Sequence, residues 1–440
     1  MKRYINMLGF YMRVFGAFVK NAFLLSFVTV TLETSMFTFL FDLAKSDILF
    51  VKILQAVSYS YDFMDEKMHR KITAYTDNAP YDDNDIDIDS FNDIYRNGFE
   101  LVDSEPKKSG MISLVYLIRH KTTNKEYILK VKRKNIDEKL DTCVFNMRGL
   151  LRCLSFVTNF WFRIDITNTI ERHLELLKEQ LDFDKEIENT KSMYSNFEHI
   201  YYVKIPKIYE EYRKLNSNYI IMEYIEGRHF SQLLQSEYTH YCDLVAKMGC
   251  TSLFVHGESH GDFHAGNLLF IRNDVEKQSD TCPEYQIGVI DFGLTIKLTN
   301  KIRDVMLYAA INYRNPKEVS NIVKRYLNAT LQPENVVDML PEKAKANILT
   351  ELENIIHKLG KDEINCSQEH FYKSFQVIND NLVCNVVDKY DIKMTDDFVK
   401  LQVASSMSNG LIMQLCDGDY NKQMDKTVKE LFHLDLFIED

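Results

Sequence analysis

The stretch SHGDFHAGNLLFIRN at residues 259–273, followed by QIGVIDFGLTIKL at residues 286–298, decides the fold of this chain. Asp262 lies in a polar turn, Asn267 follows it closely, and a run of apolar residues comes next. A second apolar run of strand length ends just before Asp291. We expect the two runs to form neighbouring strands, which would bring Asp262, Asn267 and Asp291 to one end of the pair.

Carboxylate and amide oxygens in this pattern point to phosphoryl transfer from ATP. That reaction needs metal ions to hold the β- and γ-phosphates and a carboxylate close to the attacking group. In the protein-kinase pattern the first aspartate orients the attacking group, and the asparagine and second aspartate bind Mg²⁺. We therefore assign catalysis to Asp262 and magnesium binding to Asn267 and Asp291. Each motif alone would be a weak signal, and the joint spacing carries the assignment.

A kinase also needs a lysine on a strand, which holds the α- and β-phosphates of ATP. The apolar run YILKVKR at residues 127–133 makes Lys130 the candidate. Its neighbours Lys132, Arg133 and Lys134 keep open the alternative that this stretch is only a basic strand end.

The lysine needs a glutamate on a helix to hold it. Residues 164–197 have a helical, charge-rich period, and Glu186 is the best candidate there. Glu179 and Glu188 compete, because carboxylates on such helices are usually solvated.

The stretch NYIIMEYIEG at residues 218–227 reads as a strand that runs into a turn. This pattern predicts a hinge, where the backbone near Glu223 and Tyr224 would contact adenine. The alternative is an ordinary buried strand.

The order of elements predicts an α+β, bilobal, protein-kinase-like fold. A strand-rich small lobe covers residues 98–225 and a helical large lobe covers residues 226–440. An N-terminal helical extension occupies residues 1–76, and an acidic stretch at residues 77–97 reads as a solvated linker.

Composition narrows the choice of partners. The formal net charge is −11 and the pI is near 5.6, without a concentrated basic face, which argues against nucleic acid. The eight cysteines show no zinc-ligand spacing, so an intracellular protein with reduced thiols is expected.

The N-terminus is apolar, and residues 21–41 carry a single charge, Glu33. Three interpretations stay open: a helix packed on the domain, an amphipathic helix on a membrane surface, and a single spanning helix that buries Glu33. A secretory signal fits poorly, because no small-residue cleavage site follows a short apolar core.

Together these features resemble the UbiB/AarF-domain family of atypical kinases, which includes proteins needed for coenzyme Q biosynthesis. The resemblance runs from about residue 46 to about residue 298. The family's KxGQ signature, carried on an N-terminal helical extension, aligns with KILQ, where Lys52 and Gln55 match and Leu54 replaces the glycine.

Three further family motifs align with changes. The family's alanine-rich phosphate loop corresponds to PKKSGMISLVYL at residues 106–117, where Lys108, Ser109 and Gly110 are the nucleotide-binding candidates beside Lys130, Glu223 and Tyr224. The family's HAD-x-H-x-GN loop becomes HGDFHAGN, with Gly261 in place of the alanine. The family's helix motif places its second glutamate at Glu186, with Gln180 in place of the first acid.

The resemblance implies an ATPase or small-molecule kinase rather than a protein kinase, because the KxGQ extension is thought to cover the site where a peptide would lie. It also implies membrane attachment and a lipid-linked substrate. Two alternatives remain: a soluble phosphotransferase of the aminoglycoside or choline kinase type, and a catalytically impaired nucleotide-binding scaffold.

Overall fold

The computed structural model describes residues 2–27, 32–44, 50, 79–161, 178–213, 218–361, 392–396, 411–416 and 420–432. Its contacts divide the chain into two units. Unit 1 comprises Met1–Lys191 and Pro206–Tyr224, and unit 2 comprises Ser192–Ile205 and Ile225–Asp440. The two units are described in turn.

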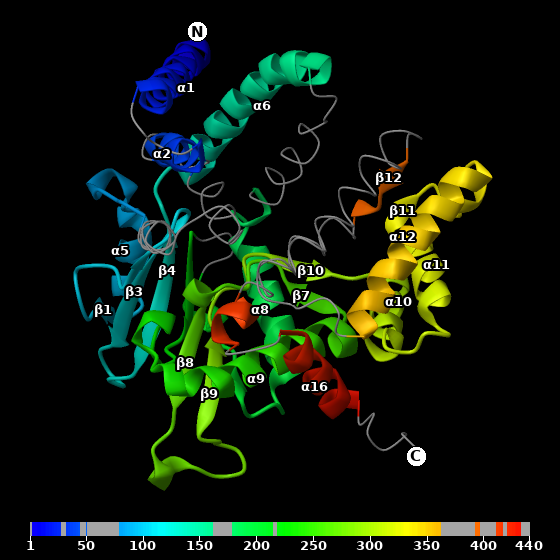
Figure 1. Cartoon of the computed structure of the whole chain (residues 1–440). Helices are drawn as coiled ribbons and strands as arrows, with labels where there is room; N and C mark the ends of the chain where they lie inside the picture. The colour runs from blue at the N-terminus through cyan, green and yellow to red at the C-terminus, as the bar shows by residue number, and fades with distance from the viewer. Residues whose placement is uncertain are drawn as a thin grey trace. The chain divides into compact units, whose positions relative to one another are not determined.

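Among the described residues, unit 1 contains an antiparallel five-stranded sheet in the order β1–β3–β4–β6, with β2 beside β3 (Figure 1). The strands are β1 (Phe99–Leu101), β2 (Lys108–Ser109), β3 (Ser113–His120), β4 (Glu126–Lys132) and β6 (Tyr219–Glu223). β3 and β4 form a hairpin, and Asn124 turns the chain with a φ of 56°. Asparagine tolerates this left-handed backbone because its short side chain can bond locally.

Each face of this sheet is covered. On one face an aromatic core forms around Phe99, Tyr116 and Tyr219. On the other face the first turns of α8 (Phe183–Phe197) pack through Phe183 and Ile187 against β6. Three consecutive residues of β4, Leu129, Lys130 and Val131, are buried because both faces of the sheet are covered.

Three helices form a second core of unit 1. They are α1 (Lys2–Phe27), α2 (Leu32–Ala44) and α6 (Ile136–Trp161). Phe10 of α1, Phe41 of α2 and Val144 of α6 meet in this core. Among the described residues, no helix is long and apolar enough to span a membrane.

The stretch expected to be a solvated acidic linker is partly built into unit 1. It contains a short 3-10 turn, η2 (Asp83–Asp85), and the helix α5 (Ile88–Arg96). Phe91 and Ile94 of α5 are buried in the aromatic core, and Asp85 is buried as well. The linker expectation fails for these residues because an acidic composition does not reveal apolar positions on one helix face or a buried cationic partner.

Unit 2 contains a three-stranded sheet in the order β5–β9–β8 and a separate pair, β7 with β10. The strands are β5 (Val203–Lys204), β7 (Glu258–His260), β8 (Leu268–Arg272), β9 (Tyr285–Val289) and β10 (Thr295–Lys297). The helix α9 (Tyr238–Cys250) packs on β8 and β9 through Tyr241 and Phe270. A π-helix, η6 (Thr251–His256), connects α9 to β7.

The remainder of the described chain is mainly helical, as predicted. It comprises α10 (Asn300–Asn312), α11 (Val319–Thr330), α12 (Glu342–Gly360), α16 (Tyr420–Phe432) and the strand pair β11 (Leu331–Gln332) with β12 (Lys393–Met394). Short 3-10 turns are η3 (Glu210–Tyr212), η4 (Phe230–Gln232), η5 (Gln235–Glu237), η7 (Ala265–Asn267), η8 (Val275–Lys277) and η9 (Val336–Met339).

Candidate functional site

Lys130 of β4 forms a buried ion pair with Glu186 of α8. The Lys130 Nζ lies 2.5 Å from the Glu186 Oε1, and the two residues are 7% and 2% exposed. The ammonium also lies 5.7 Å from the centre of the Phe183 ring. In such a dry environment opposite charges attract strongly, so this contact fixes the lysine tip relative to the helix.

The competing residues are placed elsewhere. Glu179 pairs with Lys185 at 2.6 Å, and Glu188 is exposed to solvent. The Lys132 Nζ lies 5.3 Å from the centre of the Phe183 ring and 3.8 Å from the Asp137 Oδ1. The structure therefore brings together the pair named from the sequence, Lys130 and Glu186.

The strand register places a second candidate, Lys108, on the same side of the sheet. Lys108 pairs with Val115, and Val115 pairs in turn with Lys130. Directly opposite residues of an antiparallel ladder point to the same face. Lys108 and Lys130 therefore share the sheet face on which α8 packs.

Ser109 and Gly110 follow Lys108, and both are committed to contacts within unit 1. The Ser109 hydroxyl donates to the Ala79 carbonyl at 2.6 Å, and the Gly110 amide donates to the Ser113 carbonyl at 2.9 Å. Ser109 pairs with Leu114, so its side chain lies on the face opposite Lys130. A direct contact between this hydroxyl and a nucleotide is therefore not supported by its position.

The predicted hinge residues lie at the end of β6. The Glu223 amide donates to the Lys207 carbonyl at 2.8 Å, and Glu223 pairs with Tyr127 across the sheet. The Lys107 Nζ lies 5.0 Å from the centre of the Tyr224 ring. The loop before β2 therefore contacts the hinge candidate.

In unit 2 the loop between β7 and β8 is held by a chain of hydrogen bonds. The Asp262 amide donates to the His260 Nδ1 at 3.0 Å, and the Gly266 amide donates to the His264 Nδ1 at 3.0 Å. Both histidines accept at Nδ1, so each is positioned as a neutral ring with its proton on Nε2. Sequence reasoning named this motif but gave these two rings no role.

Asp262, Asn267 and Asp291 lie around the open end of the β8–β9 hairpin. The Asn267 Nδ2 donates to the Asp262 carbonyl at 3.0 Å, and the Ile290 amide donates to the Asn267 carbonyl at 3.1 Å. The Asp291 Oδ1 accepts the Gly293 amide at 2.9 Å. The pairing of Leu268 with Val289 explains this arrangement, because it aligns the two strand ends.

The DFG-type turn also packs on the HGD turn. The Gly261 amide donates to the Leu294 carbonyl at 2.8 Å, and His260 pairs with Thr295 across β7 and β10. The His260 ring lies 5.1 Å from the Phe292 ring. The short strand pair β7–β10 was not predicted, because three-residue strands carry too little periodicity.

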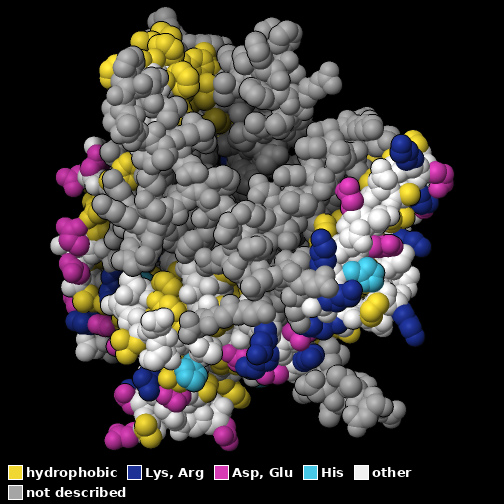
Figure 2. All heavy atoms as spheres, in the orientation of Figure 1, with side chains coloured by type: hydrophobic (Ala, Val, Ile, Leu, Met, Phe, Trp, Pro, Cys, Tyr) yellow, Lys and Arg dark blue, Asp and Glu magenta, His cyan; other side chains and the backbone are white. Residues whose placement is uncertain are grey.

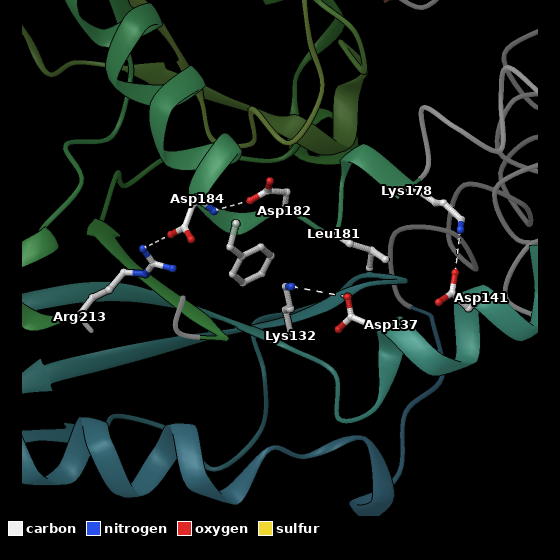
Figure 3. A pocket seen from close by; sticks show the side chains of 9 residues that line it. Lys132, Asp137, Asp141, Lys178, Leu181, Asp182, Asp184 and Arg213 are labelled. Atoms are coloured by element: carbon white, nitrogen blue, oxygen red, sulfur yellow. Dashed lines mark hydrogen bonds and ion pairs between the residues drawn. The ribbon is translucent and has the colours of Figure 1, made fainter. Parts of the chain in front are cut away.

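A cavity of about 370 Å³ opens in unit 1 beside Phe183 (Figure 3). Its cations are paired within the cavity wall: Lys178 with Asp141 at 2.7 Å and Arg213 with Asp184 at 2.6 Å. Acidic and basic side chains thus alternate around it, and the wall presents no concentrated positive charge for phosphate. We assign no ligand to this cavity.

The predicted KILQ residues and the predicted magnesium ligands remain to be placed. Lys52 and Gln55 lie outside the described residues. Within the described parts of the chain, no group of three or more His, Cys, Asp or Glu side chains could hold a metal ion. A magnesium ion shared with ATP needs only one or two protein ligands, because phosphates and water supply the rest, so Asn267 and Asp291 are a sufficient donor set.

Comparison with known proteins identifies the family. The model of the ABC1 atypical kinase-like domain matches residues 87–323, more than half of the chain. A probable protein kinase UbiB of Shewanella woodyi is 26% identical over 266 residues, which cover 58% of this chain and 46% of that protein.

Two relatives come from eukaryotes. An uncharacterized chloroplastic aarF domain-containing protein kinase of Arabidopsis thaliana is 23% identical over 68% of this chain and 41% of its own length. The aarF domain-containing kinase 1 of Drosophila melanogaster is 26% identical over 48% of this chain and 40% of its own length. The matched region is thus less than half of each of these curated relatives.

Among solved structures, that of Rv3197 with erythromycin from Mycobacterium tuberculosis has a TM-score of 0.49 and 15% identity, over 86% of this chain and 90% of that chain. The family assignment rests on the family model and the curated relatives. With these matches and the α+β architecture of its two units, the chain belongs to the ABC1 atypical kinase-like family, which is the UbiB/AarF family, and has its bilobal kinase-like fold.

Proposed function

We propose that this chain binds ATP with magnesium and transfers or hydrolyses the γ-phosphoryl group. The observation that carries the proposal is the buried ion pair of Lys130 and Glu186. Burying two charges is costly, and apolar residues of similar size often serve stability as well or better. A buried pair at the positions expected of a phosphate-binding lysine and its glutamate is therefore better explained by function than by stability.

Each candidate has a role in this reaction. Lys130, held by Glu186, binds the α- and β-phosphates, and Lys108 adds positive charge on the same sheet face. Asn267 and Asp291 would hold magnesium, which neutralises charge on the phosphates when bound. Glu223 and Tyr224 would contact the adenine.

Asp262 orients the attacking oxygen of water or an acceptor hydroxyl and accepts its proton. That oxygen forms a bond to the γ-phosphorus while the bond from the γ-phosphorus to the β,γ-bridging oxygen breaks. The products are ADP and either inorganic phosphate or the phosphorylated acceptor. His260 and His264 shape the backbone around Asp262, and the His264 Nε2 lies 3.7 Å from the Asp262 Oδ1.

The proposed acceptor is water, a lipid or another small molecule rather than a protein. The support is the family resemblance through KILQ, which in this family is associated with a covered peptide site. A soluble phosphotransferase and an impaired scaffold remain the competing functions.

The test is nucleotide binding and magnesium-dependent ATP turnover by the purified chain, compared with three variants. Asp291→Asn removes a metal ligand, so turnover falls by about a hundredfold or more. Lys130→Ala weakens ATP binding by about tenfold. Lys132→Ala is the matched control on the same strand and leaves both properties unchanged.

Two results would reject parts of this proposal. Turnover of the wild type no greater than that of Asp291→Asn would favour the scaffold. ATP affinity unchanged in Lys130→Ala, or lowered equally in Lys132→Ala, would remove Lys130 from the site.

A second part of the proposal is that α1 lies on an anionic membrane surface. One side of α1 packs in the helical core of unit 1, yet the other side exposes large apolar residues, which Figure 2 shows gathered in yellow over α1. The exposed residues are Leu8, Met12, Phe15, Phe18, Val19 and Phe23. The exposed Arg13 and Lys20 lie on the same helix, and Lys20 also pairs with Asp42. An apolar stripe bordered by cations favours an interfacial helix.

Flotation with vesicles tests this part. The wild type should float with vesicles that contain anionic lipid, and a Phe15→Asp, Phe23→Asp double variant should stay behind. Val275→Asp places the same charge at another exposed apolar residue and should behave as the wild type. Equal flotation of the wild type and the double variant would contradict it.

A further inference from the structure

Arg133, the residue after β4, is buried with every donor of its side chain satisfied. It is 5% exposed, and a guanidinium carries five N–H groups. Its Nε donates to the Gly110 carbonyl at 2.9 Å. Its Nη1 donates to the Pro80 carbonyl at 2.8 Å and to the Asp85 Oδ2 at 2.9 Å. Its Nη2 donates to the Ala79 carbonyl at 3.1 Å and to the Ser109 Oγ at 2.9 Å. Such complete satisfaction fixes the guanidinium in one orientation.

These contacts join two segments that are far from Arg133 in the sequence. One is residues 79–85, and the other is the turn Ser109–Gly110 at the end of β2. The two segments also bond to each other, since the Ala79 amide donates to the Ser109 carbonyl at 2.8 Å. The Arg133 amide donates to the Ile112 carbonyl at 2.8 Å, which closes the same turn.

A single carboxylate balances the buried charge. The Asp85 Oδ2 accepts from Arg133, while its Oδ1 accepts from Lys139 at 2.7 Å. The Asp85 carbonyl also accepts the Lys134 amide at 2.8 Å. Arg133 therefore has a local counter-ion on the segment that it holds.

Two lysines directly precede the turn that Arg133 holds, and each lies beside a candidate nucleotide-binding residue. Lys108 shares a sheet face with Lys130 through Val115, and Lys107 lies over the Tyr224 ring. Ser109, on the opposite face, is the residue that Arg133 binds. The contact between Arg133 and Ser109 on the opposite face thus determines where the backbone of Lys107 and Lys108 can lie.

We infer that Arg133 is a positioning residue for nucleotide binding, which holds the Ser109–Gly110 turn so that Lys108 stays on the face of Lys130. The inference rests on the proposed ATP-binding function. The turn lacks the alanines and the repeated glycines of other phosphate loops. In this chain the Arg133 side chain holds the loop from the sheet face opposite Lys130, in place of the close packing of small residues.

A purely structural role would be different in one measurable respect. An arginine that only stabilises unit 1 would change the unfolding temperature and leave the ATP affinity of the folded protein unaltered. A positioning residue changes the affinity of folded protein and the rigidity of the turn, even where unfolding is negligible.

The test variant is Arg133→Lys in the full chain, which keeps the charge near Asp85 but cannot reproduce the five-bond fork. We expect ATP affinity to fall by about tenfold, since the two bonds to the turn are lost. Amide hydrogen exchange at residues 107–112 should become faster. Ser109→Ala, which removes only one acceptor from the turn, should change both properties in the same direction by a smaller amount.

Lys139→Met is the matched control. It weakens the same Asp85 cluster from the exposed side, by removing the contact of the Lys139 Nζ with the Asp85 Oδ1 at 2.7 Å. It should lower the unfolding temperature and leave ATP affinity and exchange of the turn unchanged.

Equal ATP affinity in the wild type and Arg133→Lys would overturn the inference, as would unchanged hydrogen exchange in the turn. So would an affinity loss in Lys139→Met as large as that in Arg133→Lys. If Arg133→Lys does not fold, Ser109→Ala decides the question by the same two readouts. If the wild type binds no nucleotide, the proposed function fails, and hydrogen exchange alone then decides whether Arg133 holds the turn.

Discussion

At the scale of single residues, the contact of Gly261 with Leu294 explains why this chain has glycine where the family motif has alanine. A Cβ atom at position 261 would overlap the Leu294 Cγ and lie 2.8 Å from its Cδ2 and 3.1 Å from its carbonyl oxygen. The leucine side chain therefore fills the space that an alanine methyl would need. The two positions are coupled, so the effect of a side chain at position 261 depends on the side chain at position 294.

Gly261→Ala should lower the free energy of unfolding by about 1–3 kcal/mol, because it overpacks the contact between the two turns. Combined with Leu294→Ala, which makes room for the methyl, the substitution should cost much less than when it is made alone. Urea unfolding of the four proteins in a double-mutant cycle measures this coupling. Additive losses would show that Leu294 is not what excludes a side chain at position 261.

The residues whose position was predicted best are those placed by local spacing. Asp262, Asn267 and Asp291 were placed at one end of two strands because the strand length and the turn residues are local features. Arg133 was not singled out, since it lies between Lys132 and Lys134 and resembled part of a basic strand end. Its acceptors are 23 to 54 residues away in the sequence, and no local pattern connects them.

At the scale of elements, the attachment of residues 79–85 to the end of β4 depends on the charge of one carboxylate. Burial raises the pKa of Asp85, but the hydrogen bond from Lys139 and the charge of Arg133 outweigh burial and hold the pKa below its usual value. The folded-state pKa therefore lies below the unfolded one. The carboxylate stabilises the fold fully above about pH 4, and this contribution is lost as the pH falls through the folded pKa.

Asp85→Asn should lower the free energy of unfolding by about 2 kcal/mol at neutral pH. Below about pH 4 the wild type should lose this advantage, so that the stabilities of the two proteins converge. Chemical unfolding followed across this pH range measures the difference. A difference that stays constant with pH would mean that the charge of Asp85 is not the source of the stabilisation.

Element types were easier to predict than element pairing. The strands of unit 1 follow from alternation of apolar and polar residues, and α8 from its helical period. The sheet register that places Lys108 and Lys130 on one face depends on hydrogen bonds between strands, which alternation does not specify. The family alignment, rather than the helical period, singled out Glu186 from the neighbouring glutamates.

At the scale of the whole molecule, the family match is shorter than the structure that supports the candidate site. The match begins at residue 87 and ends at residue 323. Three of the five acceptors of Arg133, on Ala79, Pro80 and Asp85, lie before this start. In unit 2, Leu411, Ile412 and Leu415 are buried in the same core as α9, β8 and β9, far beyond this end.

These placements predict how the fold responds when the chain is shortened from its N-terminus. Of two shortened proteins that start at residues 79 and 87, the second would leave the buried guanidinium of Arg133 without its counter-ion, which costs about 3–5 kcal/mol. Both lack α1 and α2 and so lose the helical core with α6, and we expect the second to unfold at the lower temperature because it alone also lacks Asp85. Circular dichroism melting and size-exclusion chromatography would compare them, and equal melting would refute the expectation. The partner of a buried charge thus lies outside the boundary of family similarity.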